Sequence, residues 1–240
     1  MRKFQAIVLT LLITLPAFSQ TTTEKKKYDL SNRPGDHFML QLASNQWQGV
    51  PDSIKNKMGD LNRSANVYLM LDKPFKGDSR FSVAFGLGIG TSNIYFKKMT
   101  VDIASKNSTL PFRNTDSTER FKKFKLTTAF LEIPIEFRFT SNPVNPSKSF
   151  KIAIGVKAGT MLNAHTKGKT LQNASGGSIN EYTRKEAAKR YFNTTRLAGT
   201  ARVGYCNFSL FGAYNFTSLF KNGVAPDMKL FQIGLTLSGL

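Results

Sequence analysis

The stretch Thr127–Thr140, TTAFLEIPIEFRFT, decides the fold. Alternate positions, beginning with Ala129, are apolar, and the positions between them include Glu132, Glu136 and Arg138. Alternation over this length predicts a β-strand with one apolar and one polar face. Three ionisable groups in the middle of so hydrophobic a strand need either water or one another. We therefore expect the apolar face to contact lipid and the charged face to line the packed interior of a small closed barrel.

Seven further stretches show the same alternation and read as strands. They are Phe38–Asn45, Ala65–Lys73, Phe81–Tyr95, Phe150–Gly159, Thr195–Tyr205, Phe208–Phe216 and Phe231–Ser238. Eight strands make the smallest common membrane barrel. The sequence thus predicts an all-β protein, an eight-stranded antiparallel up-and-down transmembrane β-barrel.

The predicted connections alternate between long and short. Residues 46–63, 96–124 and 163–193 form long connections, whereas residues 74–79, 141–149 and the turn near Cys206 are short. Outer-membrane barrels have short periplasmic turns, longer extracellular loops and periplasmic termini. Bulky aromatics near the strand ends also fit two interfacial girdles. The girdle at the long-loop end would contain Trp47, Tyr95, Phe124, Tyr191, Phe192, Phe216, Phe220 and Phe231.

A soluble barrel would show the same alternation with its apolar face inside. Side-chain size favours the membrane interpretation. In Phe81–Tyr95 the polar face carries Ser82, Ala84, Gly86, Gly88 and Gly90, which suits a narrow, filled interior. A water-exposed face would instead carry frequent Lys and Glu in mid-strand.

The N-terminus has the features of an exported protein. Arg2 and Lys3 precede an apolar run, and the small-residue pattern up to Ser19 fits signal-peptide cleavage. We predict a signal peptide at 1–19, a flexible periplasmic tail at 20–36 and the barrel at 37–240, in the outer membrane with both mature termini periplasmic. The single cysteine, Cys206, excludes an intramolecular disulfide.

Charged side chains on the predicted inner face are expected to form an ion-pair network that plugs the barrel, since unpaired charges in a low-dielectric interior are costly. The set is Asp72, Glu132, Glu136, Arg138, Lys151, Lys157, Arg196 and Arg202. A symmetric turn at 141–149 would place Glu132 opposite Lys157. The alternative is a charged ion path. Pro134 removes a ladder hydrogen bond, and we expect a bulge there.

The long connections are basic, in a chain of net charge +19. Positions singled out are Lys97, Lys98, Lys122, Lys123, Arg184, Lys185, Lys189 and Arg190, with Lys167 and Lys169 in the same third loop. Basic rims attract the phosphates of outer-leaflet lipid or acidic surface polymers. Simple solvation is the alternative. Nucleic acid does not fit an exported protein whose charge is split among loops.

No catalytic constellation, metal site or cofactor site emerges from the sequence. The two histidines, His37 and His165, are predicted at opposite ends of the barrel and cannot share a metal. His165 with a loop serine could mimic a lipid A-modifying hydrolase, but nothing in the sequence fixes a partner for it, and a solvated loop histidine is strongly favoured. Gly86, Gly88 and Gly90 alternate along a strand, which is not a nucleotide loop.

The sequence Leu131-Glu132-Ile133-Pro134, the glycine-spaced strand before it and the strand Phe150–Gly159 after it resemble a family. This is the outer-membrane β-barrel domain family common in Bacteroidota, also described as porin-family or PorT-like. The resemblance implies an outer-membrane barrel without implying one activity. We expect a non-enzymatic structural or surface-interaction role, with outer-membrane lipid and lipopolysaccharide as partners. A small-solute porin or an accessory barrel that contacts secretion-system proteins is the alternative.

Overall fold

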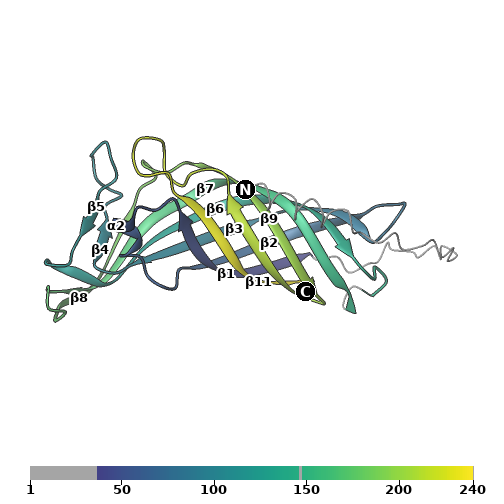
Figure 1. Ribbon diagram of the computed structural model, residues 1–240, viewed down its shortest axis with the longest axis horizontal. Helices are drawn as coiled ribbons and strands as arrows, with labels where there is room; N and C mark the ends of the chain where they lie inside the picture. Colours follow the sequence, from purple (N-terminus) through teal and green to yellow (C-terminus); the bar gives the residue numbers. More distant parts are fainter. Residues whose placement is uncertain (1–36, 146–147, 240) are drawn as a thin grey trace, which may run out of the picture. The chain divides into compact units, whose positions relative to one another are not determined.

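The computed structural model describes residues 37–145 and 148–239, and in this part of the chain eight strands close into an antiparallel barrel (Figure 1). They are β1 (Phe38–Gln48), β2 (Arg63–Pro74), β3 (Phe81–Phe96), β6 (Arg120–Thr140), β7 (Phe150–Gln172), β9 (Thr195–Tyr205), β10 (Phe208–Asn215) and β11 (Lys229–Ser238). Each pairs with the next along the chain, which confirms the predicted fold class. The predicted signal peptide and tail lie outside the described residues.

Pairing of the first and last strands closes the ring. The β1–β11 ladder runs from Met39 opposite Ser238 to Gln48 opposite Lys229. Inside the barrel the Gln41 amide donates to Thr236 Oγ1 over 3.2 Å, which links the same two strands. The barrel therefore has no open edge in its wall. Within the described ranges, no helix has the length and apolar character needed to span a membrane.

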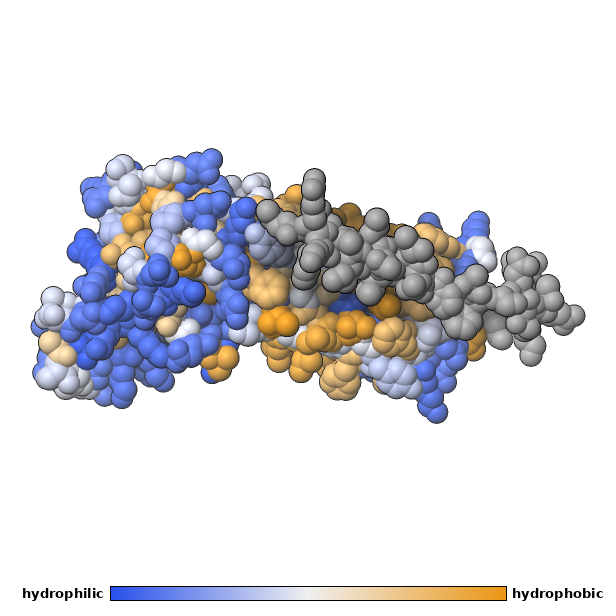
Figure 2. Space-filling model, viewed as in Figure 1, coloured by the Kyte–Doolittle hydropathy of each residue, from blue (hydrophilic) through white to orange (hydrophobic). Residues whose placement is uncertain are grey.

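An apolar belt surrounds the barrel. Each strand contributes large side chains that are about half exposed, including Leu42, Leu69, Leu87, Ile133, Ile154, Leu197, Leu210 and Leu235. Figure 2 shows this belt as a hydrophobic zone beside a hydrophilic end. A continuous exposed apolar surface of this extent requires lipid or protein against it. The belt fits the predicted orientation, with large apolar residues outside and small or charged residues inside.

At one end, which we call the cap end, the connections fold into additional structure. They contain α2 (Asp52–Lys55), the β4 (Met99–Val101) and β5 (Phe112–Asn114) hairpin, and β8 (Ser178–Ala187). At the other end, the turn end, the connections are short. The long strands β6 and β7 extend past the ring, and β8 pairs with the β7 extension. Predicting residues 96–124 and 163–193 wholly as loops was wrong, because lysines there occupy alternating strand positions and disguise the pattern.

Pro134 does not produce the expected bulge. Residues before and after it keep one register with β3, from Phe85 opposite Ile135 to Gly88 opposite Glu132, with the two pairs between them missing. The missing proline N–H interrupts the ladder without shifting it. The register shift of β6 lies instead between Ala129 and Phe130, where β7 gains a residue.

Candidate functional site

A cluster of charged groups fills the middle of the barrel interior, which we call the lumen. Lys157 Nζ lies 3.5 Å from Glu132 Oε2, and Arg196 pairs with the other carboxylate oxygen of Glu132. The Tyr68 hydroxyl donates to Glu132 Oε2 over 2.5 Å. Arg196 also lies over the Phe130 ring, 4.3 Å from its centroid. All of these side chains are buried, so one carboxylate holds two cations away from water.

A second charged cluster lies nearer the turn end. Arg138 Nε is 2.8 Å from Glu136 Oε2, and Arg202 donates to the same oxygen over 3.0 Å. Asp72 lies 3.7 Å from Arg138 and accepts a hydrogen bond from Ser82. Lys151, the remaining member of the predicted set, is also buried. The eight residues thus line one lumen, with five cations and three anions among them.

The strand register differs from the one assumed for a symmetric turn. Glu132 is opposite Gly159, and Lys157 is opposite Pro134. The difference is two residues, because pairing of β6 with β7 begins at Thr140 and Lys151. A two-residue shift keeps every side chain on its face, so Lys157 still reaches Glu132 diagonally.

Gly90 leaves the space that the Glu132 carboxylate occupies. A Cβ on Gly90 would lie 2.5 Å from Glu132 Oε2 and 3.1 Å from the Arg196 guanidinium. We expect Gly90→Ala to displace the pair and to lower the free energy of unfolding by about 1–3 kcal/mol, the usual cost of overpacking. Urea unfolding of the barrel in detergent, followed by tryptophan fluorescence, measures this change.

Gly77→Ala is the matched control, since a Cβ there meets nothing within 4 Å. It should leave the unfolding midpoint unchanged. Equal midpoints for Gly90→Ala and Gly77→Ala would contradict a tightly packed carboxylate at this point in the lumen.

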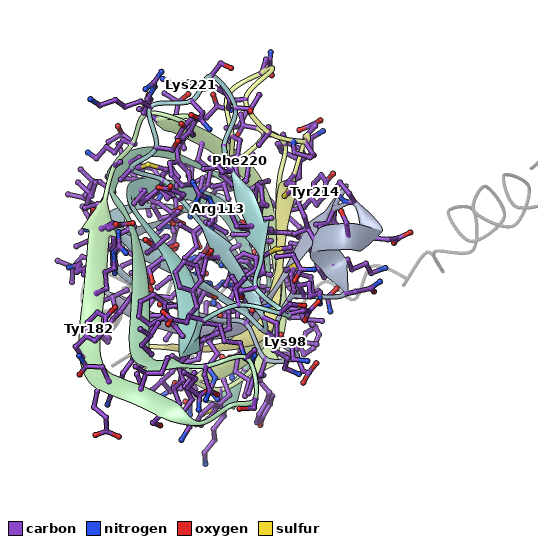
Figure 3. The ribbon with its side chains drawn as sticks, turned by 90° about the vertical axis from the view of Figure 1, so that its left-hand side faces the viewer. Lys98, Arg113, Tyr182, Tyr214, Phe220 and Lys221 are labelled. Carbon is purple, nitrogen blue, oxygen red and sulfur yellow. The ribbon has the colours of Figure 1, made fainter. Side chains whose placement is uncertain are left out.

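The cap end is filled by a hydrophobic core. Buried side chains from the wall and from the connections pack there, including Trp47, Ile54, Ile94, Met99, Val101, Ile103, Leu110, Phe124, Tyr191, Phe192, Phe220 and Met228. Phe220 lies at its centre, with ring centroids 5.1 Å from Phe192, 5.9 Å from Trp47 and 6.3 Å from Phe112. Viewed end-on, Phe220 and Arg113 lie over the barrel mouth (Figure 3).

This core corrects the expectation of an aromatic girdle at the long-loop end. Five of the eight proposed girdle residues are buried in the cap, namely Trp47, Phe124, Tyr191, Phe192 and Phe220. Phe216 is exposed, whereas Tyr95 and Phe231 are half-buried. The rings face inward because the connections supply an apolar core that covers them, which alternation within single strands does not reveal.

Hydrogen bonds between connections that are distant in sequence hold the cap together. The Tyr191 hydroxyl donates to the Ser105 carbonyl over 2.8 Å, joining the segment after β8 to the β4–β5 connection. Leu110 N–H donates to the Val224 carbonyl, also over 2.8 Å. The Asn193 amide donates to the carbonyls of Ser218 and Phe220. The cap is consequently one packed layer.

Most of the predicted basic positions lie in the cap, and several have partners. Lys97 pairs with Asp60 at 2.5 Å, Lys98 lies 3.8 Å from Asp116, and Arg184 pairs with Glu186 at 2.6 Å. The other five are placed as follows: Lys189 donates to the Met161 carbonyl, Arg190 lies over the Tyr191 ring, Lys122 and Lys123 are exposed on β6, and Lys185 is exposed on β8.

Three lysines from three strands lie side by side beyond the belt. Lys125 on β6 is opposite Lys167 on β7, which is opposite Lys185 on β8. We call Lys125, Lys167 and Lys185 the lysine row. Two positions along the ladder, Lys123 is opposite Lys169. Sequence analysis did not identify Lys125, which it placed between strand and loop; the continued alternation through Phe121–Thr127 was the available signal.

The lysine row affects the groups around it. Partial burial and the charge of Lys167 lower the pKa of Lys125. Partial burial, followed by the charges of Lys185, Lys125 and Lys167, lowers the pKa of His165. His165 lies two positions along the ladder from Lys167, opposite Thr127, and its ring contacts the Asn163 amide at 3.4 Å. We therefore expect the pKa of His165 to respond to charge bound at the row.

The opposite face of the β6–β7–β8 extension lines a cavity of about 170 Å³ under the β4–β5 hairpin. Its arginines, Arg113 and Arg184, each pair with a carboxylate, of Asp102 and Glu186 respectively. His37, at the turn end, contacts the Met70 carbonyl. Among the described residues, no three His, Cys, Asp or Glu side chains gather to hold a metal ion.

Residues 19–222 match the family model described as outer membrane protein beta-barrel domain. Among solved structures the chain is similar to Ail, the attachment invasion locus protein of Yersinia pestis, in complex with the heparin analogue sucrose octasulfate. That similarity has 13% identity and a TM-score of 0.35, over 84% of this chain and 94% of that chain. Ail in a phospholipid bilayer nanodisc is also 13% identical, with a TM-score of 0.30 over 84% and 97%. No curated protein matches the chain.

Proposed function

The chain belongs to the outer membrane protein beta-barrel domain family, and from this premise we propose that it is a non-enzymatic, non-conducting barrel that presents a basic cap at the cell surface. In this proposal the cap end is extracellular and both ends of the mature chain are periplasmic. The cap interacts with anionic molecules there, either outer-membrane lipid or acidic surface polymers.

The observation that carries the proposal is the filling of the lumen at two levels. Glu132, Lys157 and Arg196 occupy its middle, and the core around Phe220 occupies its mouth. An eight-stranded barrel is just wide enough for side chains to fill it. A continuous water path would have to break both layers. This arrangement favours the plug over the ion path that the charged residues also allowed.

The cap supports a surface role more than an enzymatic one. A hydrolase built on His165 needs a nucleophile beside its ring, and the side chain that contacts the ring is the Asn163 amide. Partial burial, followed by the charges of the surrounding lysines, lowers the pKa of His165, but an imidazole without a nucleophile beside it performs no acyl transfer. Accessory contact with secretion-system proteins remains a second candidate for the same exposed cap.

Planar-bilayer recording tests the closed lumen. We expect the purified barrel to insert without steady single-channel steps, because both layers exclude water. The comparison is the quadruple variant Glu132→Ala, Lys157→Ala, Arg196→Ala and Phe220→Ala, which removes side chains from both layers and leaves the Glu136 cluster in place. Any steps that it gains over the unmodified barrel are assigned to these two layers. Stable steps from the unmodified barrel would refute the proposal and favour a small-solute porin.

Trypsin added to intact cells tests the orientation. Cleavage after the exposed Lys106 or Lys123 of the cap is expected, while the exposed Lys76 at the turn end stays protected until the outer membrane is opened. Cleavage in the reverse order would overturn the placement of the cap outside.

A further inference from the structure

Like charges directly opposite one another across strands destabilise a sheet. The lysine row contains two such pairs, Lys125–Lys167 and Lys167–Lys185, and Lys123–Lys169 adds a third in the same ladder. Among the described residues, 37–145 and 148–239, no carboxylate forms a salt bridge with any of these five lysines, although other cap lysines have acidic partners. Among the described residues, therefore, no acidic side chain compensates the positive charge of these five lysines by an ion pair.

Uncharged neighbours hold the Lys125 side chain in place. Its Nζ donates to Asn93 Oδ1 over 2.7 Å and lies 5.8 Å from the centre of the Tyr95 ring. Both partners are uncharged, so they orient the ammonium and leave its charge uncompensated. Lys167 and Lys185 are exposed beside it. Three ammonium groups on adjacent strands, roughly 5 Å apart at the backbone, match a ligand with several phosphate oxygens.

The height of the row above the belt indicates the ligand. On β7 the belt ends at Leu162, which is 44% exposed, and Lys167 follows five residues later. At about 3.3 Å per residue and a strand tilt of about 40°, the row lies about 13 Å above Leu162 along the barrel axis. The polar layer of a phospholipid leaflet is only about 5–8 Å thick. A phosphate carried on sugars that lift it from the acyl chains reaches this height.

From this geometry we propose that the lysine row, Lys125, Lys167 and Lys185, binds the phosphates of a glycolipid headgroup in the leaflet around the cap end. The inference rests on the proposed function, because it requires the cap to lie outside the cell. It adds the ligand class and the residues that hold it. Lys167 is central, since it is opposite a lysine on each side.

Lipopolysaccharide binding in nanodiscs tests the inference. Unmodified protein is expected to bind lipopolysaccharide at least tenfold more tightly than the same preparation after phosphatase treatment. Lys167→Gln should weaken the binding of lipopolysaccharide that keeps its phosphates by at least tenfold. Lys106→Gln, which removes the same charge from an exposed cap position outside the row, should change affinity less than twofold.

Two further readouts separate binding from a purely structural role. The imidazole pKa of His165, followed by NMR, should rise when lipopolysaccharide binds, because phosphate compensates the three lysines that depress it. Without ligand, Lys167→Gln should raise the unfolding midpoint, because it removes two repulsive pairs. The expected variant is thus more stable and binds more weakly.

Four outcomes would overturn the inference, and three of them concern the phosphates, the row and the polymer alternative. They are equal affinity for phosphorylated and dephosphorylated lipopolysaccharide, equal loss with Lys167→Gln and Lys106→Gln, and tighter row-dependent binding of dextran sulfate than of lipopolysaccharide, which would assign the row to an acidic polymer. Equal affinity for phosphatidylglycerol nanodiscs would contradict the sugar-borne phosphate. Each leaves bilayer conductance and trypsin orientation untouched, so failure here is distinguishable from failure of the proposed function.

Discussion

Glu132→Ala is expected to lower the free energy of unfolding by about 3–5 kcal/mol, the cost of leaving buried charges without their partner. Lys157 and Arg196 both pair with this carboxylate, and Tyr68 donates to it. The lumen already holds more cations than anions, so no neighbouring carboxylate can replace it without breaking the Glu136 cluster. Urea unfolding in detergent, monitored by the mobility of folded and unfolded forms on gels, measures the loss.

The comparison variant replaces the whole cluster. Glu132→Met, Lys157→Met and Arg196→Met together remove the charges as a set, and such replacements in protein interiors are neutral or stabilising. We expect the triple variant to be more stable than Glu132→Ala. If Glu132→Ala alone unfolds at the same urea concentration as the unmodified protein, the carboxylate does not hold the two cations in place.

Phe220→Ala is expected to produce the second large effect. The ring is 1% exposed and contacts Phe192, Trp47 and Phe112, so its removal leaves a cavity among aromatic side chains. Truncation of a buried phenylalanine costs about 3–5 kcal/mol. The loss falls on the cap, because the strand ladders of the belt do not depend on this ring. Limited trypsin digestion should therefore cleave the β4–β5 connection many times faster than in the unmodified protein.

Phe208→Ala is its matched control. Phe208 is 65% exposed on the belt, where lipid or detergent fills the space left by the ring. Cap digestion in this variant should proceed at the unmodified rate. Equal digestion of Phe220→Ala and Phe208→Ala would show that the cap does not depend on its central ring.

The belt was predictable from sequence because a half-buried strand repeats every two residues. Glu132 and Ile133 could be assigned to opposite faces without any knowledge of neighbouring strands. The same alternation placed Lys157 and Arg196 inside, although their pairing with Glu132 depends on register and hence on the turn that precedes β7.

The cap was not predictable in this way. Tyr191 and Ser105 are 86 residues apart, and nothing local to either identifies the other. Phe192 and Phe220 face inward because separate connections cover them. Their positions at strand ends, taken alone, predict an interfacial girdle. The side-by-side arrangement of the lysine row was not predictable from the sequence for a related reason. Lys167 and Lys185 belong to a segment predicted as a loop, Lys125 lies between a predicted loop and a predicted strand, and only the pairing of β6, β7 and β8 brings the three together.

Closure of the ring by β1 and β11 has a consequence for how the chain enters lipid. Transmembrane helices satisfy their own backbone and can insert singly, whereas any partial set of these strands would carry two rows of unpaired amide groups into the hydrocarbon. The outer edge of β1 is paired only by β11, the last of the eight barrel strands in chain order among the described residues. We therefore expect the eight strands to insert together, and a chain truncated before Lys229 to lack a stable membrane-embedded form.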